Sequence, residues 1–160
     1  MAHRRALTKD TDNNFLRIMS RPKINLQILT PEKIACQDKV DQVSVPTKDG
    51  EITILPNHIP LVSLVAPGEL VIRNDSKKIP MAVWGGFVKV RPPDKVIIMT
   101  DVAERVEEID EKKAEEARQK AESALKKKDR LSDIDFANAS AILEKSLTRL
   151  RIVKKYRRRN

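Results

Sequence analysis

The chain carries two successive patterns of apolar and polar residues, which meet near residue 105. From residue 24 to residue 100, apolar side chains alternate with polar ones, as strands with one buried face require. The alternating apolar positions are Ile24, Leu26 and Ile28; Val43 and Val45; Ile52 and Ile54; Leu70 and Ile72; Met81 and Val83; and Val88 and Val90. Turn-forming pairs such as Asp49-Gly50 and Pro67-Gly68 separate these runs. Short strands at this spacing predict an antiparallel β-sandwich over residues 23–104, rather than a parallel sheet.

Beyond residue 105 the apolar spacing changes to three and four residues, which is the period of an α-helix. The helical positions are Ala114, Ala117, Ala121 and Ala124, and then Phe136, Ala139, Leu143, Ser146, Leu150 and Val153. A break at residues 129–131 separates them, and Ser132 with Asp135 predicts a capped start for the second helix. The pattern predicts an antiparallel two-helix hairpin over residues 105–155, which makes the whole chain an α+β protein.

The alanine face of the first helix bears on how firmly this hairpin is held. At about 25 cal/mol per Å² of apolar surface, an alanine face stabilises a helix pair far less than a leucine face does. We therefore expect the hairpin to be marginal by itself and to depend on docking against another part of the structure.

Charge is concentrated at the two ends of the chain. The 32 Lys and Arg against 23 Asp and Glu give +9, of which residues 1–23 carry +4 and residues 151–160 carry +6. The body between them is therefore almost neutral, which excludes a dedicated nucleic-acid fold with a basic stripe. We expect a basic, disordered extension at residues 1–22 and a basic tail at 156–160. Asp10 and Asp12 make the extension a poor targeting sequence.

Several classes of site are excluded by counts. One cysteine, Cys36, and two histidines, His3 and His58, cannot build a closed zinc site or a disulfide framework, so no metal is expected. There is no apolar run of about 18 residues to span a membrane and no apolar signal core in the first 23 residues, which favours a reducing, cytosol-like compartment. Cys36 is expected to be a small buried filler, because no neighbouring cations would lower the pKa of its thiol.

No catalytic group of residues emerges, and we expect no enzyme activity of the chain itself. Two segments nevertheless look specific. Residues 49–60 place His58 between Pro56 and Pro60, which predicts a rigid connection in which His58 bonds to the backbone. The pair Gly85-Gly86 interrupts a strand pattern, which predicts a bulge or a close approach of two backbones.

Together these motifs resemble the epsilon subunit of the F-type ATP synthase, bacterial type. The resemblance is carried by Gly-Glu-Ile-Thr-Ile-Leu-Pro-Asn-His-Ile-Pro at residues 50–60 and by Gly-Gly-Phe-Val-Lys-Val at 85–90. Ile-Leu-Thr-Pro-Glu at 28–32 and the alanine-rich hairpin complete it, in the family's order and spacing from residue 23 to 153.

The resemblance implies a non-catalytic rotor subunit of the central stalk, with a β-sandwich followed by a two-helix domain. It implies binding to the gamma subunit and to the c-subunit ring, and contacts with the alpha and beta subunits. The role would be to couple proton flow to ATP synthesis, peripherally on the cytoplasmic side of the cell inner membrane, with no cofactor required.

In bacterial members the C-terminal hairpin inhibits ATP hydrolysis when it extends along gamma. The resemblance places Glu51 and His58 on the edge that faces the c ring. The basic cluster suited to an inhibitory contact is Arg151, Lys154, Lys155, Arg157, Arg158 and Arg159.

Some members also bind ATP as a regulatory ligand in the folded hairpin, through an Ile-Asp-x-x-Arg-Ala motif. Residues 109–114 match it with Lys113 in place of the arginine, and lysine lacks the bidentate fork of a guanidinium. The full set of matching positions is Glu104, Asp110, Lys113, Lys120, Lys145 and Arg149. An equally simple interpretation is that Asp110 caps a helix and the lysines form a solvated face.

A function of another class stays open. The chain could be a non-enzymatic adaptor whose basic tails hold RNA or anionic lipid. The charge of the tails supports this alternative, whereas the absence of aromatic stacking platforms in the body of the sequence opposes nucleic-acid binding.

Overall fold

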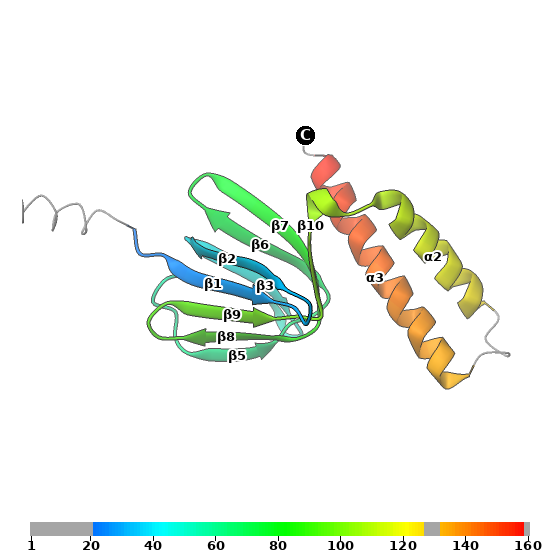
Figure 1. Cartoon of the computed structure of the whole chain (residues 1–160), viewed down its shortest axis with the longest axis horizontal. Helices are drawn as coiled ribbons and strands as arrows, with labels where there is room; N and C mark the ends of the chain where they lie inside the picture. The colour runs from blue at the N-terminus through cyan, green and yellow to red at the C-terminus, as the bar shows by residue number, and fades with distance from the viewer. Residues whose placement is uncertain (1–20, 127–131, 159–160) are drawn as a thin grey trace, which may run out of the picture.

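The computed structural model describes residues 21–126 and 132–158 of the 160-residue chain. The expected extension before residue 21, the helix break at 129–131 and Arg159 lie outside the described residues. Within them, ten strands form two five-stranded sheets, and a short 3-10 helix and two α-helices follow (Figure 1). The predicted α+β fold, a sandwich and then a helical hairpin, is confirmed.

The two sheets are layered face to face. Sheet A has the order β2 (Ile34–Val40), β1 (Ile24–Leu29), β9 (Lys95–Met99), β8 (Phe87–Arg91) and β5 (Leu61–Leu64). Sheet B has the order β10 (Val102–Arg105), β7 (Lys77–Trp84), β6 (Gly68–Asn74), β3 (Gln42–Thr47) and β4 (Gly50–Ile54).

One strand pair departs from the antiparallel prediction. β1 pairs in parallel with β9, with Leu26 opposite Val96, while the other strand pairs in the described residues are antiparallel. The two strands come from opposite ends of the sandwich sequence and are not joined by a hairpin. Turn signals report only local hairpins, so they cannot predict this pairing.

The alternating residues form the sandwich core, as expected. Ile24, Leu26 and Ile28 are fully buried between the sheets, while Asn25 between them is exposed. β7 is different, because its second half is buried on both faces. Met81 and Val83 belong to the sandwich core, and Ala82 and Trp84 belong to a second apolar cluster beneath the C-terminal helix. The outer face of β7 is thus where the hairpin docks.

The two adjacent glycines join the sheets. Gly85 and Gly86 lie between β7 and β8 and have positive φ angles of 64° and 100°. A Cβ on Gly86 would lie 1.9 Å from the carbonyl oxygen of Met99. Of the two predicted features, the close approach of two backbones is the one the structure contains, and it sits at a connection between sheets rather than at a bulge.

The hairpin begins after the 3-10 helix η1 (Val106–Glu108) and consists of α2 (Glu111–Leu125) and α3 (Asp133–Arg157). Both predicted N-caps are confirmed, since Asp110 accepts a hydrogen bond from the Lys113 amide and Ser132 accepts one from the Asp135 amide. Figure 1 shows α3 lying beside α2, with the C-terminal half of α3 near β7 and β10, and with the end of α2 and the start of α3 pointing away from the sheets.

Candidate functional site

The junction between sandwich and hairpin is built around Arg149 of α3. Its guanidinium donates two hydrogen bonds to the Glu104 carboxylate on β10, Nε to Oε2 at 2.9 Å and Nη2 to Oε1 at 2.5 Å. The same group lies over the indole ring of Trp84, 4.9 Å from its centroid. A bidentate, partly buried pair on an aromatic face is among the stronger arrangements available to arginine.

A second polar contact lies near the C-terminal end of α3. Lys155 Nζ donates to Glu69 Oε2 on β6 at 2.5 Å, and the Tyr156 hydroxyl donates to the other oxygen of the same carboxylate. The Glu69 side chain is only 15% exposed. Lys78 of β7 lies over the Tyr156 ring, 5.4 Å from its centroid. Both contacts therefore join a carboxylate of sheet B to a cation of α3.

A small apolar cluster lies at this junction. Ala82, Trp84, Val106, Ile152 and Val153 are buried together. The indole Nε1 of Trp84 is buried and has no hydrogen-bond partner among the described residues. Glu69, Trp84 and Tyr156 were missed as functional residues by sequence reasoning, because Glu69 meets its partners across 86 and 87 positions of sequence. The sequence around each residue does not indicate a contact across so many positions.

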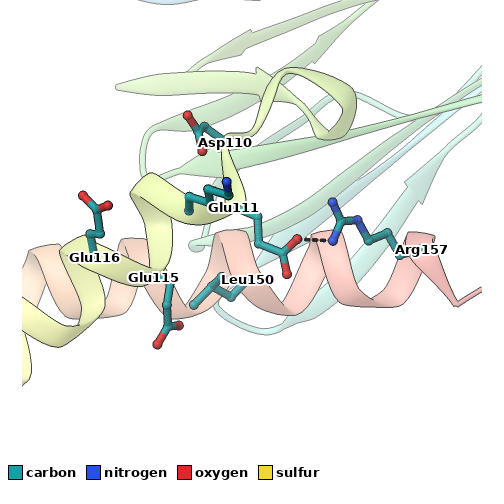
Figure 2. Close-up of a pocket in the computed structure, with 7 residues that line it drawn as sticks. Asp110, Glu111, Glu115, Glu116, Leu150 and Arg157 are labelled. Carbon is teal, nitrogen blue, oxygen red and sulfur yellow. Dashed lines mark ion pairs between the residues drawn. The ribbon is translucent and has the colours of Figure 1, made fainter.

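The start of α2 carries an open hollow of about 770 Å³ (Figure 2). Its lining residues are Asp110, Glu111, Lys112, Glu115, Glu116, Leu150 and Arg157. Figure 2 shows the ion pair between Glu111 and Arg157, which joins α2 to the end of α3. The backbone amide of Lys113 is the main cause that lowers the pKa of Asp110. With four carboxylates in its lining, the hollow favours cations more than phosphate groups.

Of the six residues of the expected nucleotide set, the structure brings four together as two ion pairs and leaves Lys120 and Lys145 apart from them. Glu104 and Arg149 bind each other, and the Lys113 ammonium lies 3.7 Å from the Asp110 carboxylate. Lys120 is exposed further along α2, and Lys145 is half-buried on α3. Of the six, only Asp110 lines the hollow at the start of α2.

The expected inhibitory cluster divides into paired and solvent-facing cations. Lys155 binds Glu69 and Arg157 binds Glu111. Arg151, Lys154 and Arg158 are exposed and form no ion pair within the described part of the chain.

The two residues expected to face the c ring lie toward opposite ends of β4. Glu51 is exposed near the start of β4, opposite Pro46 of β3. His58 lies in the connection that follows β4, with its Nδ1 atom 2.8 Å from the carbonyl oxygen of Ile59. The Asn57 amide donates to the Asp94 carboxylate, which ties this connection to the turn between β8 and β9. The predicted bonding of His58 to the backbone is confirmed.

Cys36 lies on β2, half-buried, and packs against the sandwich core. Burial is the main cause that raises the pKa of its thiol. A raised pKa keeps the sulfur protonated and unreactive, as expected for a filler, although the side chain is half-buried rather than buried as predicted.

The outer face of sheet A carries a row of apolar side chains that crosses all five strands. Ile34 pairs with Leu29, Leu29 with Met99, Met99 with Phe87, and Phe87 with Leu64. Ile34 is 58% exposed and Phe87 is 49% exposed. Because side chains opposite each other in a sheet point to the same face, the five form one continuous strip. Strips of this kind mark protein interfaces more often than free surface.

Both domains of the chain match a known protein family. Residues 23–106 match the beta-sandwich domain of the ATP synthase delta/epsilon chain, and residues 107–154 match its long alpha-helix domain. The chain belongs to the delta/epsilon chain family of ATP synthase. It is therefore a non-catalytic subunit of that complex.

Bacterial relatives cover nearly the same length. The chain is 45% identical to the ATP synthase epsilon chain of Chloroflexus aggregans over 129 residues, which are 81% of this chain and 91% of that one. It is 42% identical to the epsilon chain of Herpetosiphon aurantiacus over 136 residues, 85% of this chain and 98% of that one.

A solved structure shares the fold. A chain in the mitochondrial ATP synthase of Euglena gracilis superposes with a TM-score of 0.69 at 22% identity, over 92% of this chain and 96% of that one. Among residues 21–126 and 132–158, no helix is both long and apolar enough to cross a membrane. The same residues contain no group of three or more His, Cys, Asp or Glu arranged to hold a metal ion.

Proposed function

We propose that the chain turns with the gamma subunit and the c-subunit ring in the central stalk, and that its C-terminal hairpin regulates ATP hydrolysis. The observation that carries the proposal is the way the hairpin is attached. Among the described residues it meets the sandwich through one small apolar cluster, the ion pairs Arg149–Glu104 and Lys155–Glu69, and the contact of Lys78 with the Tyr156 ring; Lys155 belongs to the basic cluster.

Such an attachment suits a switch between two arrangements. The buried face of α2 consists of Ala114 and Ala121, so little apolar area is lost if the helices separate. α3 has apolar residues on more than one side, and Ile134, Ile142 and Leu147 remain exposed in the docked hairpin. An extended helix could bury them against gamma, while the basic cluster meets the alpha and beta subunits. Two packings that differ by a few kcal/mol can be rebalanced by a partner.

We assign the apolar strip of sheet A, Leu29, Ile34, Leu64, Phe87 and Met99, to the gamma subunit. Glu51 and His58 are proposed as contacts of the c ring. Through these partners the chain would lie peripherally on the cytoplasmic side of the cell inner membrane and take part in proton-driven ATP synthesis.

Locking the hairpin tests its regulatory role. In a Cys36→Ser background, Glu69→Cys and Lys155→Cys place two thiols at a direct contact, and a short bis-maleimide can bridge them. The assembled enzyme with the bridged subunit should hydrolyse ATP faster than the same enzyme left unbridged, because the hairpin can no longer extend. Each single-cysteine variant, treated alike, is the control. Equal rates for bridged and unbridged enzyme would overturn the regulatory role.

The partner assignments have separate tests. Phe87→Glu changes an exposed side chain, so the subunit should still fold but should no longer co-purify with gamma; Lys89→Glu on the same strand is the matched control. Glu51→Cys should cross-link to a cysteine in a polar loop of the c subunit. Cross-links only to alpha or beta would show the proposed orientation to be wrong, and salt-sensitive recovery with RNA or lipid in place of gamma would favour the adaptor alternative.

A further inference from the structure

The cations near the end of α3 divide between two faces of the helix. Arg151, Lys154 and Arg158 are spaced at i, i+3 and i+7, which places them on one face, and all three are exposed. Arg149 and Lys155 point instead to the sandwich, where each meets a carboxylate. The sandwich therefore binds some cations of the helix and leaves others to solvent.

The two carboxylates are placed so that they need these partners. Glu69 lies on β6 and Glu104 on β10, on either side of β7, whose outer face receives α3. With α3 docked, their side chains are 15% and 30% exposed, so each has lost much of its water in this arrangement. A carboxylate in such a position is unfavourable unless cations and hydrogen-bond donors replace that water. Arg149 donates hydrogen bonds to Glu104, and Lys155 and the Tyr156 hydroxyl donate hydrogen bonds to Glu69.

We propose that Glu69 and Glu104 form a two-point ionic clasp that holds α3 on the sandwich and occupies Lys155 and Arg149. An acidic surface of a partner can then engage these cations only by displacing both carboxylates. The clasp rests on the proposed function, because it matters for hydrolysis only if the hairpin regulates it. It adds to that function a competition for Lys155 and Arg149 between the carboxylates of the chain's own sandwich and the carboxylates of the partner.

Competition of this kind depends on ionic strength. The Lys155 side chain is 51% exposed, so salt reaches its contact with Glu69. The screening length falls from about 10 Å at 0.1 M salt to about 3 Å at 1 M, which weakens exposed pairs. The apolar cluster between the two carboxylates is not weakened by salt in this way. Added salt should therefore increase the fraction of undocked hairpin in the wild type. It should have no such effect in a variant that lacks the clasp.

The chain contains its own reporter for docking. Trp84 is the sole tryptophan, is 3% exposed beneath α3, and has Arg149 over its ring. Undocking would expose the indole to water and remove the guanidinium. Acrylamide quenching of its fluorescence in the full-length subunit then measures the fraction of hairpin that has left the sandwich.

The test compares Glu69→Gln and Lys155→Gln with two matched controls, Glu108→Gln and Lys154→Gln. Glu108 and Lys154 are exposed and form no ion pair within the described residues. Loss of one clasp contact should raise the ratio of undocked to docked hairpin about fivefold, which corresponds to about 1 kcal/mol. The controls should quench like the wild type. Glu69→Lys combined with Lys155→Glu should restore docking, because the charges are exchanged at one contact.

Two readouts separate the clasp from the regulatory role. Quenching that is the same in Glu69→Gln and wild type, at 0.1 M and 1 M salt, would overturn the clasp, even if removal of the hairpin changes hydrolysis. Increased quenching in Glu69→Gln together with unchanged hydrolysis by the assembled enzyme would confirm the clasp and overturn the regulatory role. Increased quenching with slower hydrolysis, and no such change in Glu108→Gln, would support both.

Discussion

The guanidinium of Arg149 lies 4.9 Å from the centroid of the Trp84 ring and binds the Glu104 carboxylate at the same time. One side chain of α3 thus connects the helix to two adjacent strands, β7 and β10. An arginine over an indole contributes from about 0.5 to 2 kcal/mol, depending on its exposure to water. Arg149 also belongs to the proposed nucleotide set, so a phosphate group that binds Arg149 would have to displace the Glu104 carboxylate.

The pair Glu104 and Arg149 should show measurable coupling. A double-mutant cycle with Glu104→Gln and Arg149→Met should give a coupling of about 1 to 2 kcal/mol in urea unfolding followed by circular dichroism, because both side chains are partly buried. The pair Glu111 and Arg157 is the control, because the Arg157 side chain is 73% exposed. Its coupling energy should be about 0.3 kcal/mol. Equal couplings for the two pairs would show that burial gives Glu104 and Arg149 no advantage.

Gly86 should tolerate no side chain. Alanine there would place a Cβ 1.9 Å from the Met99 carbonyl oxygen and would keep a strained φ of 100°. We expect Gly86→Ala to lower the free energy of unfolding by more than about 3 kcal/mol, measured by thermal denaturation. Gly50 has a φ of 119° with open space around it, so Gly50→Ala should show strain alone, about 1 kcal/mol. Similar losses at both positions would mean that the close contact relaxes.

Asp110 should make the stability of α2 depend on pH. Its pKa is lowered in the folded chain, mainly by the Lys113 amide. The ionised carboxylate therefore stabilises the fold fully above the unfolded pKa of about 3.9, and this contribution is lost as the pH falls through the lower folded value.

Asp110→Asn keeps an acceptor for the cap but has no charge to lose. Unfolding measured across the acid range should show a shallower decline for this variant than for the wild type. Asp101→Asn, at an exposed position of the sandwich, is the control. If Asp110→Asn and the wild type decline in parallel, the carboxylate of Asp110 does not cause the pH dependence.

Nucleotide binding can be measured on the isolated subunit. We propose that ATP would lie with its adenine and ribose near Asp110 and Lys113 and its phosphates near Lys120, Lys145 and Arg149. Lys113→Arg with Lys120→Arg should tighten binding in calorimetry, because the bidentate geometry returns. A hundredfold excess of ligand over its Kd would stabilise the compact hairpin by about 2.7 kcal/mol. No heat and no thermal shift in either protein at millimolar ATP would leave Asp110 as a helix cap.

The solvent-facing cations of α3 should act in inhibition without acting in docking. Changing Arg151, Lys154 and Arg158 together to glutamine should raise ATP hydrolysis by the assembled enzyme, because the extended helix would lose three cations for an acidic surface. Quenching of Trp84 should stay at the wild-type value, since none of the three contacts the sandwich through an ion pair. Unchanged hydrolysis at low salt would show that these three residues take no part in the inhibitory contact.

Local sequence was sufficient to predict much of this protein. The alternation around Leu26 and Val83 predicted buried strands, and Asp110 and Ser132 predicted the two helix starts. Gly85-Gly86 predicted a bulge or a close approach of two backbones, and the structure contains the close approach. Each of these signals is local, because strand periodicity, capping and glycine conformation all act within a few residues of the chain.

The contacts that matter for the hairpin were decided only by the tertiary structure. Nothing near Glu69 indicates that it meets Lys155 and Tyr156, and nothing near Trp84 indicates that Arg149 covers it. The strip from Ile34 to Leu64 likewise exists only because β1 pairs in parallel with β9. Periodicity states which side of a strand or helix is apolar, but not which other element lies against it. That choice is made by long-range pairing, in which partly buried charges must find opposite charges wherever the fold brings them.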